Sequence, residues 1–194
     1  MKKLGGGWQH VVYDMGNGRV YKKFRSPLNR FFHIGFNSEM SFLDIHKESK
    51  RMVAEVTRSF EILRQNKIPK DLIGNPELLP NFDYTQDKVV PLQKLLNNLD
   101  TEKAKKLVDE FIILNKKMME LGFIDLSFKI AVNFGLNSEG KIILTDIGEI
   151  VTDPNRIVSQ RKERDWHSNY VSDQIKNVEV RKYYQDQMDL HFGL

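Results

Sequence analysis

The stretch from Leu121 to Ile150 limits what this chain can fold into more than any other part of it. A helix is expected to end at Gly122, because glycine readily adopts the left-handed conformation that stops helices. The residues after it read as a polar loop, a short apolar run, a tight turn and a strand at 141–144. This order predicts a β-hairpin with Asn133 close to its start and Asp146 just past its end.

The two side chains at the ends of this hairpin carry its chemistry. An amide oxygen and a carboxylate can converge there on one magnesium ion, which prefers oxygen ligands and shares them with phosphates. Asn133 and Asp146 lie thirteen positions apart, and Asp146 begins the sequence Asp-Ile-Gly. The segment therefore resembles the catalytic loop and the Asp-Phe-Gly metal loop of the protein-kinase-like fold. On that resemblance, Asn133 and Asp146 bind Mg, and Lys129 is the lysine that often follows the catalytic aspartate.

The position of the catalytic base departs from the kinase pattern. Kinases place the base five residues before the asparagine, and that position here is Phe128. Asp125 lies eight residues before Asn133, and Ser127 lies six before it. If Asp125 is the base, the loop must absorb three extra residues; if Ser127 takes its place, the general base is lost. Asp125 is the expected catalytic residue, since a carboxylate within reach of a hydroxyl can take its proton.

A glycine-rich start and a lysine-bearing strand open the chain. Residues 4–24 read as a three-stranded meander with an Asn-Gly turn. Alternation along the last strand puts Lys22 on one face and Lys23 on the other. Because Val-x-Lys is the kinase-like pattern, Lys22 is expected to hold the phosphates of ATP. Three glycines would let backbone N–H groups approach phosphate oxygens closely: Gly5, Gly6 and Gly7.

Kinases pair the strand lysine with a glutamate on a helix, which predicts a similar helix here. After a linker at 26–35, Asn37 or Ser38 can cap a helix that carries Glu39, seventeen residues after Lys22. A second helical pattern covers 52–65 and carries Glu55. Glu39 is the expected partner of Lys22, and Glu55 is the alternative.

The rest of the chain reads as the connection between two lobes and a helical second lobe. A short apolar run at 89–92 suits the hinge, and a helix is expected from Asp100 or Thr101 to about residue 121. A basic stretch follows at 156–166, and a closing helix at 178–194. We therefore expect an α+β fold with two lobes: residues 1–92, with a small antiparallel sheet, and residues 93–194, a shortened, mainly helical lobe.

Composition narrows the class of protein. The chain has 194 residues, no cysteine and a formal net charge of +4. The lack of cysteine excludes disulfides and thiolate metal sites. No apolar run approaches the length that spans a membrane, and the first residues lack the apolar core of a signal peptide, so we expect a cytoplasmic protein without a membrane partner. The mild positive charge suits phosphate ligands, while nucleic-acid binding is unlikely.

Further local patterns indicate a family. The sequence Leu-Ser-Phe-Lys followed by an asparagine, then Asp-Ile-Gly-Glu, then Arg-Lys-Glu-Arg-Asp-Trp, is similar to the bacterial YrbL family of PhoP regulatory network proteins. That family is kinase-like and has a serine near the expected base. The resemblance implies that Lys22 holds phosphates, that Glu39 orients Lys22, and that Asn133 and Asp146 bind magnesium. It also implies that Ser127 takes the place of the usual base.

Three functions are compatible with these residues. The first is an ATP- and Mg-dependent phosphotransferase acting on a hydroxyl of a protein or small molecule. The second is a pseudokinase, which binds nucleotide or regulates a protein partner without catalysis; the altered catalytic loop and the irregular glycine loop favour it. The third is an interaction module unrelated to kinases, for which the spacing from Asn133 to Asp146 is a coincidence.

Overall fold

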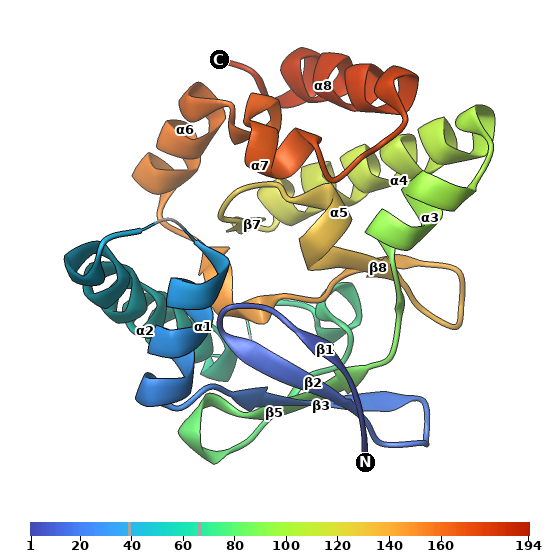
Figure 1. Cartoon of the computed structure of the whole chain (residues 1–194). Helices are drawn as coiled ribbons and strands as arrows, with labels where there is room; N and C mark the ends of the chain where they lie inside the picture. Colours follow the sequence, from blue (N-terminus) through green and yellow to red (C-terminus); the bar gives the residue numbers. More distant parts are fainter. Residues whose placement is uncertain (39, 66) are drawn as a thin grey trace.

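The computed structural model describes residues 1–38, 40–65 and 67–194, and its two parts differ in secondary structure. The N-terminal part is built on an antiparallel sheet, and the C-terminal part is mostly helical (Figure 1), so the expected α+β class is confirmed. The two chain ends lie at opposite ends of the molecule.

The predicted meander forms three neighbouring strands of the N-terminal sheet. In the described chain this sheet has the order β1-β2-β3-β5-β4, with antiparallel pairing throughout. Gly16 and Gly18 both have positive φ at the turn between β2 and β3, which explains why glycines flank Asn17 there. The strands are β1 (Lys2–Gly6), β2 (His10–Asp14), β3 (Arg19–Phe24), β4 (Glu77–Leu78) and β5 (Tyr84–Asp87).

Two helices separate β3 from β4, and both differ from expectation. The expected linker at 26–35 is instead helix α1 (Pro27–Asn37), which is capped by Ser26. The two expected helical patterns merge into one helix, α2 (Phe42–Arg64), whose cap is Ser41 rather than Asn37 or Ser38. A small apolar cluster holds α1 and α2 together, comprising Ile34, Ile45 and Met52 with Trp8 and Phe31 packed against it.

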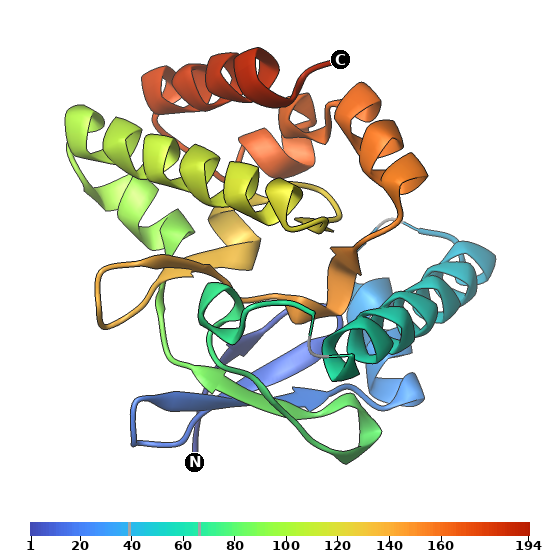
Figure 2. The ribbon, with the colours of Figure 1, turned by 180° about the vertical axis from the view of Figure 1, so that it is seen from behind.

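Helix α2 bridges the two parts of the molecule. Figures 1 and 2 show it beside the sheet, close to the chain around residue 150. The hydroxyl of buried Ser59 accepts a hydrogen bond from the backbone N–H of Ile150 at 3.0 Å. Two ionic hydrogen bonds, of 3.0 and 3.2 Å, join Glu55 to Arg156. The helix is thus attached both to the segment after Asp146 and to the helix beyond it.

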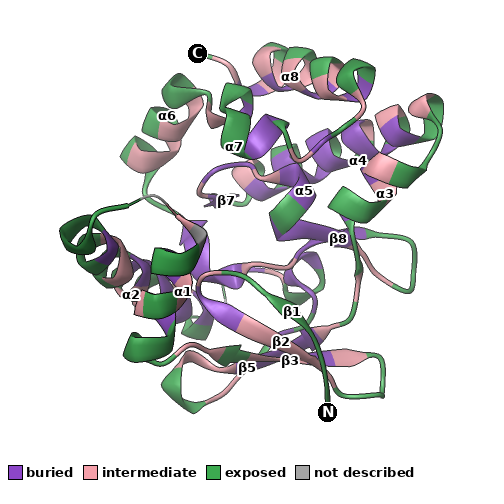
Figure 3. Cartoon of the chain, viewed as in Figure 1, coloured by how far each residue is buried: buried purple, intermediate pink, exposed green. Residues whose placement is uncertain are grey.

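The C-terminal part surrounds one large core. Helix α4 (Thr101–Glu120) packs against α8 (Val178–Phe192), and Asp100 caps α4 as predicted. The core continues from α2 to α8 and fills the interior (Figure 3), so the division at residue 92 stays a prediction. The remaining helices are α3 (Leu92–Asn98), α5 (Ile130–Asn133), α6 (Pro154–Glu163) and α7 (Asn169–Ser172).

Two short antiparallel ladders contain most of the strands in the segment from Leu121 to Ile150. The predicted hairpin is β8 (Phe134–Leu136) with β9 (Ile142–Leu144), and β6 (Val90–Pro91) extends it on the β8 side. Strand β7 (Ile124–Asp125) pairs with β10 (Ile150–Val151), so that Asp125 lies opposite Ile150. These two ladders bring the loop after β7 and the loop after β9 to the same place.

No helix in the described ranges is long and apolar enough to cross a membrane.

The bond between α2 and β10 can be tested through Ser59. Replacing Ser59 by Ala leaves the buried N–H of Ile150 without an acceptor, and an unsatisfied buried group of this kind destabilises by about 1–3 kcal/mol. Urea unfolding should therefore show a lower free energy of unfolding for Ser59→Ala. Thr57→Ala is the matched control, because the Thr57 hydroxyl bonds only to Val53 in the same helix. Equal losses in the two variants would contradict the bridging role.

Candidate functional site

The loop from β7 to β8 closes around the carboxylate of Asp125. This side chain is fully buried, and its Oδ1 accepts a hydrogen bond from Asn133 Nδ2 at 2.8 Å. Its Oδ2 accepts from the backbone N–H of Lys129 at 3.2 Å. The loop therefore brings Asp125 and Asn133 into direct contact although eight positions separate them.

Phe128 accounts for the extra length of this loop. Its φ of +50° lies in the left-handed region, which is uncommon outside glycine and reverses the chain locally. The reversal buries the Phe128 ring against Trp166 and Phe192, with ring centres 5.7 and 5.4 Å away. The position where kinases have the base is thus a core residue here. Ser127 is buried as well, and its hydroxyl has no hydrogen-bond partner among the described residues.

The charge state of Asp125 is set by its burial. Burial raises the pKa of the Asp125 carboxyl to about 7, while the charge of Lys129 opposes the rise. A carboxyl that titrates near neutral pH can exist in both protonation states under ordinary conditions. This is the property that a general base needs.

Asn133 and Asp146 line the same cavity, of about 830 Å³. The backbone oxygen of Asn133 accepts hydrogen bonds from the N–H and the hydroxyl of Thr145, at 2.6 and 2.9 Å. Asp146 follows directly and remains partly exposed, with its Oδ1 bonded to Gly148 N at 3.1 Å. The ends of the hairpin are therefore joined at the backbone oxygen of Asn133.

The donor set fits magnesium that is shared with phosphate. Because Asn133 Nδ2 donates to Asp125, the amide oxygen on the same carbon is turned away from that carboxylate. An amide oxygen and the Asp146 carboxylate are hard ligands of the kind magnesium takes alongside substrate phosphates and water. No cluster of three or more His, Asp or Glu side chains in the described chain could hold a metal alone. A metal at this two-residue set would therefore need further oxygen ligands from water or from a bound molecule.

Lys22 extends from strand β3 of the N-terminal sheet to the backbone next to Asp146. Its ammonium donates a hydrogen bond to the backbone oxygen of Thr145, the residue before Asp146, and lies 5.3 Å from the centre of the Tyr84 ring. Burial lowers the pKa of Lys22 to about 8, and the nearby Asp146 carboxylate partly opposes this lowering. Lys23, its neighbour, is exposed, so the alternation predicted for this strand is confirmed.

The glycine loop lies over the cavity, but its glycines differ in their roles. Gly6 and Gly7 line the cavity with Asp146, whereas Gly5 does not. A Cβ at Gly6 would lie 2.6 Å from the backbone oxygen of His10, so only glycine fits there. The N–H of Gly7 already donates to that same oxygen at 3.0 Å. The Gly7 N–H is therefore already used in the turn between β1 and β2. This restricts the approach to phosphate that was expected of it.

Among the described residues, no glutamate on a helix pairs with Lys22. Glu39 lies outside the described residues. Glu55, the alternative, is paired with Arg58 and Arg156 at 2.8 and 3.0 Å. The charged group that raises the pKa of Lys22 is the Asp146 carboxylate.

Glu149 was not selected from the sequence, yet it joins three parts of the site. Its carboxylate accepts from Lys129 Nζ at 3.3 Å and from Gln9 Nε2 at 3.4 Å. A Cβ at Gly148 would lie only 2.0 Å from Gln9 Oε1, so the glycine loop packs directly on the Asp-Ile-Gly turn. Burial raises the pKa of Glu149, and Lys129 opposes the rise. The motif Asp-Ile-Gly-Glu contained this residue, but no sequence signal pointed to Gln9.

Tyr170 closes the cavity on the side of α7. It is 56% exposed, and the Lys129 ammonium lies 5.3 Å from the centre of its ring. Trp166 and Tyr184, the other large aromatics near this end of the chain, are fully buried, whereas Tyr170 faces the cavity.

Comparisons with known proteins add no family to this description. No model of a protein family matches the chain, and no curated protein matches its sequence. The likeness to the YrbL family therefore rests on the short motifs quoted above.

The buried Asp125 should make stability depend on pH. Its raised pKa means that the folded state binds more protons than the unfolded state between about pH 4 and pH 7. The free energy of unfolding should therefore fall as pH rises through that window, by up to about 1.4 kcal/mol per pH unit from this group. Asp125→Asn removes this contribution, so the free energy of unfolding of wild type minus that of the variant should decrease from pH 4 to pH 7 in urea titrations. A constant difference would contradict the assignment.

Proposed function

We propose that this chain is an ATP- and magnesium-dependent phosphotransferase of the protein-kinase-like class, which moves the γ-phosphate of ATP to a hydroxyl group. The observation that carries the proposal is the meeting of three distant segments at Thr145. Lys22 binds its carbonyl oxygen, Asn133 binds its N–H, and Asp146 follows it. Asn133 and Asp146 line one cavity, and Lys22 is bound to the residue before Asp146. A lysine, an amide and a carboxylate are the groups that phosphate and magnesium need.

The order of elements supports a kinase-like fold as part of the same proposal. A strand with the lysine is followed by a long helix packed beside the sheet, and then by a hairpin that leads into Asp-Ile-Gly. The short ladder of β7 with β10 places Asp125 next to Glu149 and close to Asp146. These spatial relations support the proposal.

Each residue has a separate task in the proposed reaction. Lys22 would neutralise phosphate oxygens from the sheet side of the cavity. Asn133 and Asp146 would hold magnesium, which draws charge from the phosphates and aligns them. Asp125 would accept the proton of the attacking hydroxyl while that oxygen bonds to phosphorus and ADP leaves. Lys129, bound to Glu149, would lie where negative charge develops on the transferred group.

One observation favours a second function, a pseudokinase. Asp125 is fully buried, and each of its carboxylate oxygens already accepts a hydrogen bond. A base held in this way must be uncovered before it can meet a hydroxyl. If it stays covered, the chain would bind nucleotide and regulate a protein partner without transferring phosphate.

Nucleotide binding is tested by removing Lys22. Lys22→Ala should weaken ATP binding about 10- to 100-fold in the presence of magnesium, because a charged hydrogen bond to phosphate is worth about 1.5–3 kcal/mol. Isothermal titration calorimetry measures the effect directly. Lys23→Ala is the control from the same strand, and its affinity should equal that of wild type. ATP binding that Lys22→Ala leaves unchanged would contradict both the phosphotransferase and the nucleotide-binding pseudokinase.

Phosphate transfer separates the two functions. With labelled ATP and a panel of protein and small-molecule hydroxyls, wild type should transfer phosphate, and Asp146→Ala should abolish the transfer. The rate should rise with pH through about 7 as Asp125 loses its proton, and Asp125→Asn should slow it by about 10²–10⁴-fold. Asp186→Asn, on the exposed face of α8, is the control. Binding of ATP without transfer by wild type would instead establish the pseudokinase.

A further inference from the structure

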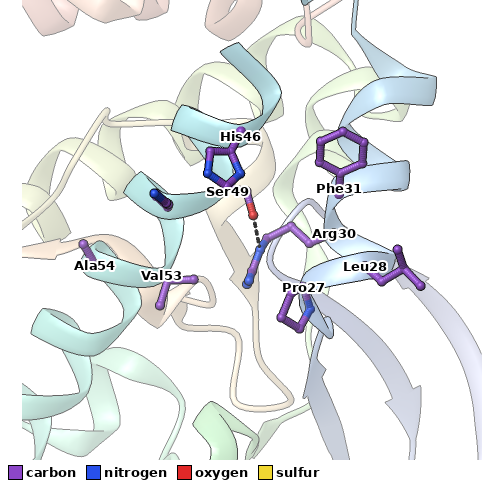
Figure 4. A pocket seen from close by; sticks show the side chains of 9 residues that line it. Pro27, Leu28, Arg30, Phe31, His46, Ser49, Val53 and Ala54 are labelled. Atoms are coloured by element: carbon purple, nitrogen blue, oxygen red, sulfur yellow. Dashed lines mark hydrogen bonds between the residues drawn. The ribbon is translucent and has the colours of Figure 1, made fainter. Parts of the chain in front are cut away.

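A second cavity lies in the N-terminal part, between α1 and α2. It has a volume of about 680 Å³, and its lining residues come from 27–31 of α1 and 46–54 of α2 (Figure 4). None of them lines the cavity with Asp146. We name this cavity the α1–α2 groove.

The groove contains a buried cation. Arg30 is only 2% exposed and extends from α1 towards α2, where its Nε donates to the hydroxyl of Ser49 at 2.9 Å. Its guanidinium carbon lies 4.7 Å from the centre of the Phe24 ring. Its Nη1 has no hydrogen-bond partner, and no described carboxylate forms an ion pair with it. Burial lowers the pKa of this guanidinium.

The other polar groups of the groove do not supply the missing anion. Of the nine residues that line it, all described, Arg30, His46 and Lys50 are basic and none is Asp or Glu. Glu48 lies in the same stretch of α2, but its carboxylate is bound to Arg51 at 2.6 Å. A buried guanidinium without an anion is unfavourable, whereas its planar fork matches a carboxylate well.

The surface beside the groove is apolar. Leu28, Phe32 and Phe36 follow one another at four-residue spacing along α1, and they are 66, 50 and 85% exposed. Phe42 at the start of α2 is 71% exposed and touches Phe31, with ring centres 5.0 Å apart. Four large apolar side chains exposed together indicate a contact with another macromolecule rather than with a small ligand alone.

We propose that the α1–α2 groove binds a segment of a partner protein that presents a carboxylate among apolar side chains. The carboxylate, from an aspartate or a glutamate, pairs with Arg30, and Lys50 adds a second cation at the edge. The apolar side chains of the segment cover the stripe formed by Leu28, Phe32 and Phe36. This site is separate from the proposed phosphotransferase site and does not depend on it.

The charge requirement is tested with three small probes of related shape: phenylacetate, phenylacetamide and phenyl phosphate. NMR of the full chain should show saturable shifts at Arg30 Nε–H with phenylacetate, at least ten-fold weaker binding of the amide, and no binding in Arg30→Met. Lys50→Gln should weaken binding, and Lys47→Gln, on the same helix outside the groove, should not. Equal binding of acid and amide would overturn the proposal, as would preference for phenyl phosphate. If Arg30→Met fails to fold, Arg30→Lys replaces it, because lysine keeps the charge but loses the fork.

The protein partner is tested with a library of displayed twelve-residue peptides. Peptides selected on the wild-type chain and depleted on Arg30→Met should be enriched in Asp or Glu next to Leu or Phe. Peptides selected on the wild-type chain and depleted on Lys47→Gln should show no enrichment in acidic residues. Absence of acidic residues from the selected peptides would overturn the proposal. Binding to phosphatidylserine vesicles that persists in Arg30→Met would assign the surface to lipid instead.

Discussion

The backbone at Thr145 is the point on which the rest of the site depends. Its carbonyl oxygen accepts from Lys22, and its N–H donates to the carbonyl of Asn133. One residue thus fixes the N-terminal sheet, the hairpin and Asp146 relative to each other. Both bonds use backbone atoms of Thr145. A change of the Thr145 side chain should therefore disturb the arrangement less than a shift of the hairpin register. A slip of one residue would turn every hairpin side chain to the opposite face.

The loop before the hairpin brings Asp125 and Asn133 together across eight positions. Three residues more than the kinase pattern separate Asp125 from Asn133, yet the two side chains are hydrogen-bonded, and Phe128 between them has a left-handed backbone and a buried ring. The ring buried against Trp166 offsets the strain of its left-handed backbone, because burying a large aromatic side chain stabilises by about 1.5–3 kcal/mol. Loop length alone is therefore a poor test of whether Asp125 can reach the site.

Local signals predicted the first three strands, the hairpin and the long helices of the second part. The cap at Asp100, the positive φ of Gly122 and the inward face of Lys22 all follow from rules that act over a few residues. Strand β5 could not be predicted in this way, because it has the polar sequence Tyr-Thr-Gln-Asp and Gln86 is buried through bonds to the distant backbone of Ile73 and Leu144. The bond from Gln9 to Glu149 spans 140 positions and likewise has no local signal.

Lys22 and Arg30 present the same physical situation at two places. Each is a cation largely removed from water, each lies near an aromatic ring, and neither forms an ion pair with a described carboxylate. Removing a cation from water without an anion is unfavourable for the free protein. An anion that arrives from outside regains that free energy on binding, so such a group contributes more to affinity than an exposed lysine would. This is the common physical reason for proposing phosphate at Lys22 and a carboxylate at Arg30.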